Sequence, residues 1–297
     1  MTEQAYEIIG DSADRDAWLA LRRTGIGGSD APAILGLVGW ASPSSVQADK
    51  WNLAPEAEDA EVMRWGRRLE DVIAEGLGAD EGWEVFIYGL LLRSTRHPFM
   101  LCTPDAQRLT DRIFVQIKNT VKAEDWQERV PEAVWVQCQH EMAVTGDTRC
   151  IAAALILGNR LRWSYVERDD AFLETVLIPA ERDFWERTQN LEPAPADGSE
   201  HTKRAYQLLW PKDSGETVAL DGYFTALDRE RHELLGIKKT AEERLNSIDN
   251  EIRLALKDAT FGVLQNGVVY SNKTQTRKEH VVKESTFRVL RRKEAKT

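Results

Sequence analysis

The segment C-T-P-D-A-Q-R-L-T-D-R-I-F-V-Q-I-K-N-T (102–120) constrains the fold of this chain more than any other. Its second half, R-I-F-V-Q-I-K (112–118), has a two-residue period that predicts a β-strand. Gln116 and Lys118 therefore share one face of the strand, and the apolar residues on either side of Gln116 share the other. Asp105 follows a proline eleven residues before Gln116.

These three side chains predict metal-assisted hydrolysis of a phosphodiester bond. The oxygens of Asp105 and Gln116 are ligands for Mg²⁺, which Mn²⁺ can replace. Lys118 would orient the attacking water or stabilise the developing negative charge. Taken alone, the spacing is also compatible with a surface turn followed by an amphipathic edge strand.

The composition of the 297 residues excludes several classes of protein. No run approaches the roughly 20 apolar residues that span a bilayer, so no membrane partner is expected. The N-terminal M-T-E-Q-A-Y-E-I-I-G-D has neither a basic nor an apolar signal region, which favours a cytoplasmic protein. Five histidines and three cysteines show no zinc-ligand spacing, and the cysteines are expected to be reduced.

Charge is distributed unevenly along the chain. The net charge of −10 argues against a general nucleic-acid coat protein. Residues 273–297 nevertheless contain nine Lys or Arg against three acids, whereas residues 56–84 contain ten acids against three arginines. The basic C-terminal segment could follow a phosphate backbone, or it could be a solvated strand and terminus.

The pattern of helices and strands predicts an α/β core followed by an appendage. Helices are expected at 12–24, 31–36, 43–51, 61–79, 131–145 and 176–190, with strands at 83–88, 90–95, 112–118, 151–157 and 162–168. The segment E-P-A-P-A-D-G predicts a linker at 192–200 between a core of residues 1–191 and an appendage of residues 201–297. A long charged helix (221–258) and a small basic β element make up the predicted appendage.

Five segments, in order, resemble motifs of one known family. They are W-L-A-L-R-R-T-G-I-G-G-S-D-A-P-A-I-L-G (18–36), G-R-R-L-E (66–70), H-P-F-M-L-C-T-P-D-A (97–106), V-Q-I-K (115–118) and V-P-E-A-V-W-V-Q-C-Q-H-E-M-A-V-T-G (130–146). Together they resemble the YqaJ-like viral recombinases, the phage lambda exonuclease family within the PD-(D/E)XK nucleases. The resemblance covers about residues 12–190 and leaves the C-terminal third outside it.

The resemblance implies a restriction-endonuclease-like α/β core, in which helices flank a mixed central sheet. It implies a Mg²⁺-dependent exonuclease that degrades double-stranded DNA from a 5′-phosphate end in the 5′→3′ direction. The resulting 3′ single strands would serve phage-type homologous recombination in a bacterial host. A single-strand annealing protein is the partner that the family implies, and a ring-shaped homo-oligomer is one assembly that it implies.

The resemblance also implies roles for individual residues. Asp105, Gln116, the main-chain carbonyl of Ile117 and Glu70 are expected to hold the metal. Lys118 is expected to act on the attacking water.

Further roles concern the DNA and the support of the lysine. Gln137 is expected to hold Lys118 or a phosphate, and Gln139 is a second candidate for contacting DNA. Arg23 and Ser29 resemble the family's pocket for a 5′-phosphate. An arginine and a hydroxyl beside a glycine-rich turn at a helix start make a suitable anion site.

Gln116 departs from the family motif, which has an acid there. The amide keeps one carbonyl oxygen but lacks the full negative charge. Glutamine could be a natural variant that still binds metal, a substitution that traps a substrate complex, or a sign that cleavage has been lost. We favour a site that is catalytic in its native form. The alternatives are a non-cleaving DNA-end-binding protein, a structure-specific endonuclease, and an interaction protein built on the 221–258 helix.

Overall fold

The computed structural model describes residues 4–53, 61–123, 126, 128–276 and 288–292. The chain forms two compact units, residues 1–211 and residues 212–297. The first unit contains every site residue expected from the sequence. Among the described residues, no helix is long and apolar enough to cross a membrane.

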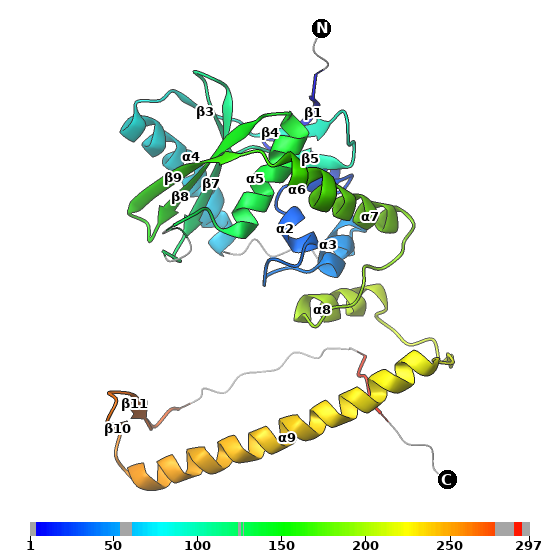
Figure 1. Cartoon of the computed structure of the whole chain (residues 1–297), viewed down its shortest axis with the longest axis vertical. Coiled ribbons are helices and arrows are strands. Elements are labelled where there is room, and N and C mark those ends of the chain that lie inside the picture. The colour runs from blue at the N-terminus through cyan, green and yellow to red at the C-terminus, as the bar shows by residue number, and fades with distance from the viewer. Residues whose placement is uncertain (1–3, 54–60, 124–125, 127, 277–287, 293–297) are drawn as a thin grey trace. The chain divides into compact units, whose positions relative to one another are not determined.

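A five-stranded sheet organises the first unit (Figure 1), with the strand order β3-β6-β7-β8-β9. Its strands are β3 (Val85–Ile87), β6 (Ala106–Arg108), β7 (Ile113–Thr120), β8 (Arg149–Ile156) and β9 (Arg160–Glu167). The pair β7 and β8 is parallel and the other neighbours are antiparallel. The sheet is therefore mixed, as expected from the sequence.

The faces of this sheet are covered by α4 (Glu61–Glu81) and α5 (Glu132–Thr145). Val115 and Ile117 of β7 pack with Ile73 and Leu77 of α4 in one apolar cluster. Gln116, between the two apolar residues, points to the opposite face, as its period-two position requires. Apolar burial on one face thus fixes the direction of the polar side chains on the other.

A second sheet, in the order β1-β4-β5-β2, adjoins the N-terminal helices. Its strands are β1 (Tyr6–Asp11), β4 (Leu90–Ser94), β5 (Met100–Cys102) and β2 (Ile26–Gly27). The short β2 lies between α1 (Arg15–Arg22) and α2 (Ala31–Ile34), and α3 (Pro43–Lys50) follows. Parallel pairing of β2 with β5 brings the glycine-rich turn beside the strand that leads to Asp105.

The C-terminal part of the first unit differs from the predicted linker. After α6 (Asp170–Phe172), the π-helical turn η2 (Leu173–Leu177) and α7 (Ile178–Gln189), the chain continues into α8 (Glu200–Leu209). Ala194 is buried, and its N–H donates to Oε1 of Gln47 at 2.6 Å. Thr202 of α8 is also buried and donates to Ser42 Oγ at 2.9 Å. The compact unit therefore extends through residues 192–200 to residue 211.

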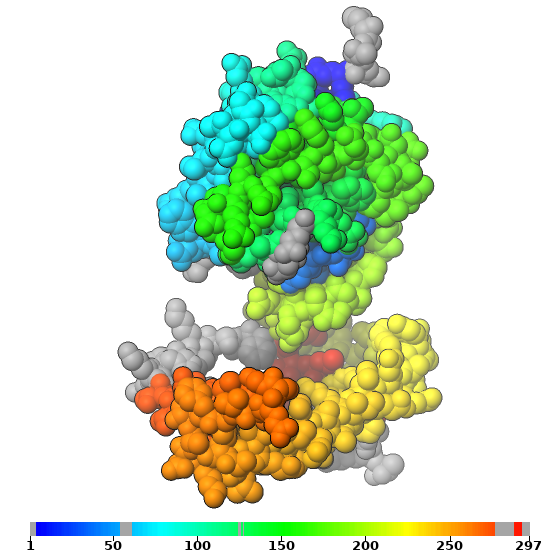
Figure 2. Space-filling model, turned by 60° about the vertical axis from the view of Figure 1, so that its left-hand side comes forward, coloured from blue at the N-terminus to red at the C-terminus, as the bar shows by residue number. Residues whose placement is uncertain are grey.

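The second unit contains α9 (Gly222–Leu256) and a two-stranded sheet of β10 (Phe261–Val263) and β11 (Val269–Ser271). No described residue of α9 is buried, and Figure 2 shows its side chains at the surface, in yellow to orange. The long helix and small β element agree with the sequence prediction. Most of the alternating basic segment lies in 277–287 and 293–297, outside the described residues.

Candidate active site

The pairing of β6 with β7 brings Asp105 and Gln116 together. Ala106 pairs with Val115 in antiparallel register. Asp105, which precedes Ala106, therefore lies beside Gln116, which follows Val115. Nε2 of Gln116 donates a hydrogen bond to Oδ2 of Asp105, and the backbone N–H of Ile117 donates to the same oxygen at 2.6 Å. The Asp105 carboxylate is therefore fixed in direction by two donors.

Glu70 of α4 and Lys118 of β7 line the same pocket as Asp105 and Gln116. This pocket has a volume of about 510 Å³ and also includes Gln137. A larger hollow of about 880 Å³ beside β9 contains none of the site residues expected from the sequence. The structure therefore brings together six of the predicted residues: Glu70 on α4, Asp105 in the turn before β6, Gln116 and Lys118 on β7, Gln137 on α5, and Ser29 in the glycine-rich turn.

Two carboxylates in this pocket, Glu70 and Asp105, have raised pKa values. Burial, followed by the nearby charge of Asp105, raises the pKa of Glu70 to about 7, although Lys118 opposes the shift. Burial also raises the pKa of Asp105, against the opposing effects of Lys118 and of the two hydrogen bonds from Ile117 and Gln116. A nearby cation lowers the pKa of a carboxylate, so a metal ion in this pocket would favour the ionised form of both groups.

The oxygen atoms in the pocket are suitable ligands for a hard divalent cation. Glu70 and Asp105 supply carboxylate oxygens, and the carbonyl of Ile117 adds a neutral oxygen on the adjoining strand. Nε2 of Gln116 lies 3.4 Å from this carbonyl while it also contacts Asp105. Rotation of the amide by 180° would exchange its nitrogen for Oε1 without moving the rest of the side chain. Among the described residues, no three His, Cys, Asp or Glu form a metal-binding group.

The two glutamines of α5 have different environments. Gln137 lies in the pocket, and its Nε2 donates to Oε1 of Gln116 at 2.9 Å. Gln139 is fully buried away from it, donating to the carbonyl of Glu167 and accepting from the N–H of Asp169, both at 2.8 Å. Gln139 thus joins α5 to the segment after β9 and does not line the pocket, so the structure offers no route by which it contacts DNA there.

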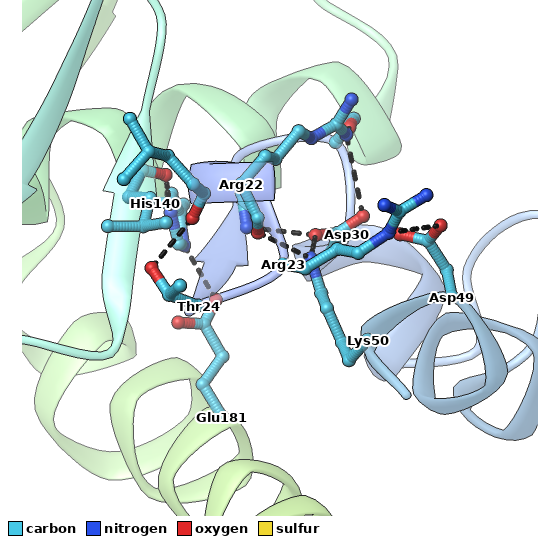
Figure 3. Close-up of polar contacts among 12 residues, drawn as sticks. Arg22, Arg23, Thr24, Asp30, Asp49, Lys50, His140 and Glu181 are labelled. Carbon is cyan, nitrogen blue, oxygen red and sulfur yellow. Dashed lines mark hydrogen bonds and ion pairs between the residues drawn. The ribbon is translucent and has the colours of Figure 1, made fainter. Parts of the chain in front are cut away.

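The glycine-rich turn holds a second group of polar residues in the pocket. Arg22 Nη2 lies 3.6 Å from Asp30 (Figure 3) and 2.5 Å from Ser29 Oγ. The pocket is lined by Arg22, Ser29, Gly27 and Gly28. Asp30 is the N-cap residue of α2, but α2 has no side-chain capping hydrogen bond. The side chains of Ser29 and Asp30 instead contact Arg22. We call the part of the pocket formed by Arg22, Ser29, Gly27 and Gly28 the basic corner.

Asp30 has a structural role in this corner. Its Oδ2 accepts from Lys50 Nζ at 2.7 Å and from the N–H of Gly27 at 2.9 Å. Burial alone would raise the pKa of Asp30, but Lys50 and Arg22 lower it to about 2. The permanent negative charge holds the turn and Arg22 in place.

Arg23 points elsewhere. Its Nε lies 3.8 Å from Asp49 (Figure 3). Arg23 is absent from the lining of the pocket. Consecutive residues of a helix point about 100° apart, so only one of the two arginines can face Ser29. The structure therefore pairs Ser29 with Arg22 and not with the arginine expected from the sequence.

Two buried acids near the site were not expected from the sequence. Glu141 lies four residues after Gln137 on α5 and lines the pocket, a spacing that places both on one helix face. Glu181 of α7 lies 2.8 Å from Nδ1 of His140, whose Nε2 donates to the Leu101 carbonyl at 2.8 Å (Figure 3). Burial would lower the pKa of His140, but Glu181 and this carbonyl raise it. The His140 contacts tie α5 and α7 to the strand that precedes Asp105.

Comparisons with known proteins agree with the fold and the motifs. Residues 17–148 match the model of the YqaJ-like viral recombinase domain. The chain is 32% identical over 319 aligned positions to the uncharacterized protein YqaJ of Bacillus subtilis, with 97% of this chain and 98% of that protein covered.

A solved structure gives the fold. The alkaline exonuclease LHK-Exo of Laribacter hongkongensis is similar with a TM-score of 0.50 and 18% identity, over 66% of this chain and all of that one. The mixed sheet flanked by α4 and α5 is thus a restriction-endonuclease-like α/β fold. Full-length similarity to YqaJ and the domain match together show that the chain belongs to the YqaJ-like viral recombinase family.

Proposed function

We propose that this protein is a Mg²⁺-dependent deoxyribonuclease that degrades double-stranded DNA from a 5′-phosphorylated end, in the 5′→3′ direction. One observation carries the proposal. Glu70, Asp105, Gln116 and Lys118 line one pocket together with the Arg22–Ser29 pair. A site for phosphodiester hydrolysis needs oxygen ligands, a lysine and an anion-binding corner side by side.

The residues of the chain divide the work of hydrolysis. Mg²⁺, when bound, supplies neutralisation of phosphate charge and lowers the pKa of water. Asp105 and Glu70 would hold the cation, and Gln116 would join them only with its amide turned so that Oε1 faces them. Lys118 donates to the attacking water or to the non-bridging phosphate oxygens, on which negative charge grows. Gln137 donates to Oε1 of Gln116 at 2.9 Å and so favours the orientation in which the amide nitrogen faces Asp105. Turning the amide would break this hydrogen bond.

The basic corner would select the DNA end. Arg22 and Ser29 supply charge-assisted and neutral donors for a terminal phosphate, and the backbone of Gly27 and Gly28 allows close approach. A site that binds a terminal 5′-phosphate beside the hydrolytic residues holds the first internucleotide bond near them. This arrangement supports an exonuclease over an endonuclease.

The remaining family properties are part of the same proposal. The product would be a 3′ single strand, used by a single-strand annealing protein in phage-type homologous recombination in a bacterial cytoplasm. A homo-oligomer around the DNA would keep the enzyme on its substrate. Membership of the recombinase family supports these assignments.

A non-cleaving protein that binds DNA ends is the second candidate. The orientation of Gln116 favours it, because the amide nitrogen faces Asp105 and a nitrogen donor cannot ligate a cation. In that case Arg22, Ser29 and the basic tail would still bind the end, but no nucleotide would be released.

Nucleotide release from a linear 5′-phosphorylated duplex distinguishes the two candidates. The reaction is measured with Mg²⁺ and with Mn²⁺ for the unmodified chain, for Asp105→Ala and for Gln116→Glu. Release that Asp105→Ala abolishes supports the nuclease. Release by Gln116→Glu alone supports a nuclease weakened at this residue, and no release by either favours the end-binding protein. Cutting of a circular duplex would overturn the exonuclease assignment.

A further inference from the structure

Glu141 is a buried carboxylate in the candidate active site that the proposed reaction does not use. It lies on α5 and is 3% exposed, yet it contributes to the lining of the pocket that contains Asp105 and Lys118. Burial of an ionisable group costs free energy unless a partner offsets it. A buried glutamate at this position is therefore expected to have a partner or a role that offsets the cost of its burial.

One amide nitrogen connects Glu141 to the position where the family motif has an acid. Nε2 of Gln137 lies 2.9 Å from Oε1 of Glu141 and 2.9 Å from Oε1 of Gln116. An amide NH₂ group has two hydrogens, so it can donate to both oxygens at once. Gln116 in turn donates to Asp105. The four side chains form one hydrogen-bonded chain from Glu141 to Asp105.

The glycine-rich turn is shaped around Glu141. A Cβ atom at Gly28 would lie 2.9 Å from Oε1 of Glu141 and 3.3 Å from Cγ of Gln137. Any larger residue at position 28 would therefore push the Glu141–Gln137 pair out of place. The close approach shows that the turn and the carboxylate are packed as one site.

The electrostatic surroundings link Glu141 to the proposed metal ligands. Burial, then the charge of Asp105, raises the pKa of Glu141 to about 7, and Lys118 acts in the opposite direction. Glu70 experiences the same two neighbours. When ionised, these three carboxylates and Lys118 carry a net charge of −2, which one divalent cation would balance.

We propose that Glu141 is a positioning residue that supplies, through Gln137, the negative charge that Gln116 lacks, so that the pocket can hold a divalent cation. The inference rests on the proposed metal-dependent function. Glu141 does not touch the cation itself. It acts as its hydrogen-bonded support, in the way that outer carboxylates orient and strengthen the ligands of a metal.

Binding of Mn²⁺ to the full chain, measured by titration calorimetry at pH 8 without DNA, tests the inference. Glu141→Gln is expected to weaken the affinity about 10-fold or more, the usual effect of removing an outer carboxylate. The double variant Gln116→Glu/Glu141→Gln has the same formal charge as the original site, and its affinity is expected to return to within about 3-fold of it. Glu132→Gln, at an exposed position of the same helix, is the matched control and should not change the affinity.

A purely structural role for Glu141 predicts different results. The unfolding midpoint of the metal-free Glu141→Gln variant would fall, and adding Gln116→Glu would not restore Mn²⁺ binding. The inference is overturned if the double variant binds Mn²⁺ as weakly as Glu141→Gln does. It is also overturned if Glu141→Gln binds Mn²⁺ as tightly as the original chain. If neither the single nor the double variant folds, Glu141 is needed for folding regardless of charge, and the inference is also overturned.

Asp105→Ala separates this inference from the proposed function. Loss of Mn²⁺ binding in Asp105→Ala with normal binding in Glu141→Gln would leave the metal site intact and reject only the role of Glu141. Normal binding in Asp105→Ala would reject the metal site, and both proposals with it.

Discussion

Nε2 of Gln116 donates its hydrogen bond to Oδ2 of Asp105, the carboxylate that the family motif assigns to the metal. Gln116 is 2% exposed, so its amide cannot exchange this partner for bulk water. Nε2 of Gln137 donates to Oε1 of Gln116 and to Oε1 of Glu141, and the first of these hydrogen bonds depends on the direction of the Gln116 amide. The Gln116–Asp105 contact thus controls whether a nitrogen or an oxygen faces the cation position.

Gln116→Glu is expected to strengthen divalent-cation binding and nucleotide release. The substitution adds a full charge and a second oxygen where the amide nitrogen now faces Asp105, and the number of charged ligands sets the affinity of such sites. We expect a gain in Mn²⁺ affinity of about 10-fold or more, the scale of a single supporting carboxylate. Titration calorimetry measures it. Equal or weaker binding would show that Gln116 is not beside the cation.

Lys118→Ala is expected to separate binding from cleavage. Loss of the ammonium group removes stabilisation of the growing phosphate charge, which costs about 10²-fold or more in rate. Mn²⁺ binding should persist, because Lys118 is not an oxygen ligand and repels a cation. Single-turnover release from a 5′-phosphorylated duplex gives the rate, and calorimetry gives the affinity. A fall in affinity with an unchanged rate would contradict the assigned role.

Arg22→Ala and Arg23→Ala form a matched pair for the phosphate corner. Arg22 contacts Ser29 within the pocket, whereas Arg23 lies near Asp49. Loss of a charged hydrogen bond to phosphate should weaken binding of 5′-phosphorylated ends by about 10- to 100-fold in Arg22→Ala. The preference over 5′-hydroxyl ends should disappear with it, and Arg23→Ala should keep that preference. Fluorescence anisotropy with both kinds of end tests this pair, and the reverse outcome would restore Arg23 as the phosphate ligand.

The pH dependence of stability follows from the buried carboxylates. The pKa of Glu141 is raised from 4.5 to about 7 in the folded protein. Below pH 4.5 both the folded and unfolded states keep the proton. Between pH 4.5 and 7 only the unfolded chain releases it, so this group lowers the free energy of unfolding as the pH rises. The full loss, about 3 kcal/mol, is reached above pH 7.

Metal-free Glu141→Gln should therefore be more stable than the original chain at pH 8 and close to it at pH 4.5. Urea denaturation at both values measures the difference. Because Glu70 and Glu141 must ionise to favour a cation, Mn²⁺ affinity of the original chain should rise from pH 6 to pH 8. An affinity that stays constant over this range would contradict the raised pKa values.

The sequence predicted the central strand because its alternation is strong and its apolar face is buried. Val115 and Ile117 pack against α4, which leaves Gln116 and Lys118 on the other face as expected. By contrast, β5 and β6 have three residues each, too few for a periodic pattern to identify. Their positions follow from pairing with distant strands, which a single sequence does not reveal.

Other differences have equally local causes. The choice between Arg22 and Arg23 depends on the rotation of α1, which the pair R-R does not specify. The Pro- and Ala-rich segment near 192–198 predicted a linker, but Ala194 is buried against Gln47 and α8 follows. Glu141 could have been found, because its four-residue spacing from Gln137 places both on one face of a helix.

Anomalous scattering from crystals soaked in Mn²⁺ tests most directly whether these side chains surround a common cation. The account predicts a peak about 2 Å from oxygens of Asp105 and Glu70 and from the carbonyl of Ile117, the distance typical of small hard cations. Asp105→Ala crystals treated in the same way should lack it. Strong Mn²⁺ peaks at other places, with none between Asp105 and Glu70, would contradict the account.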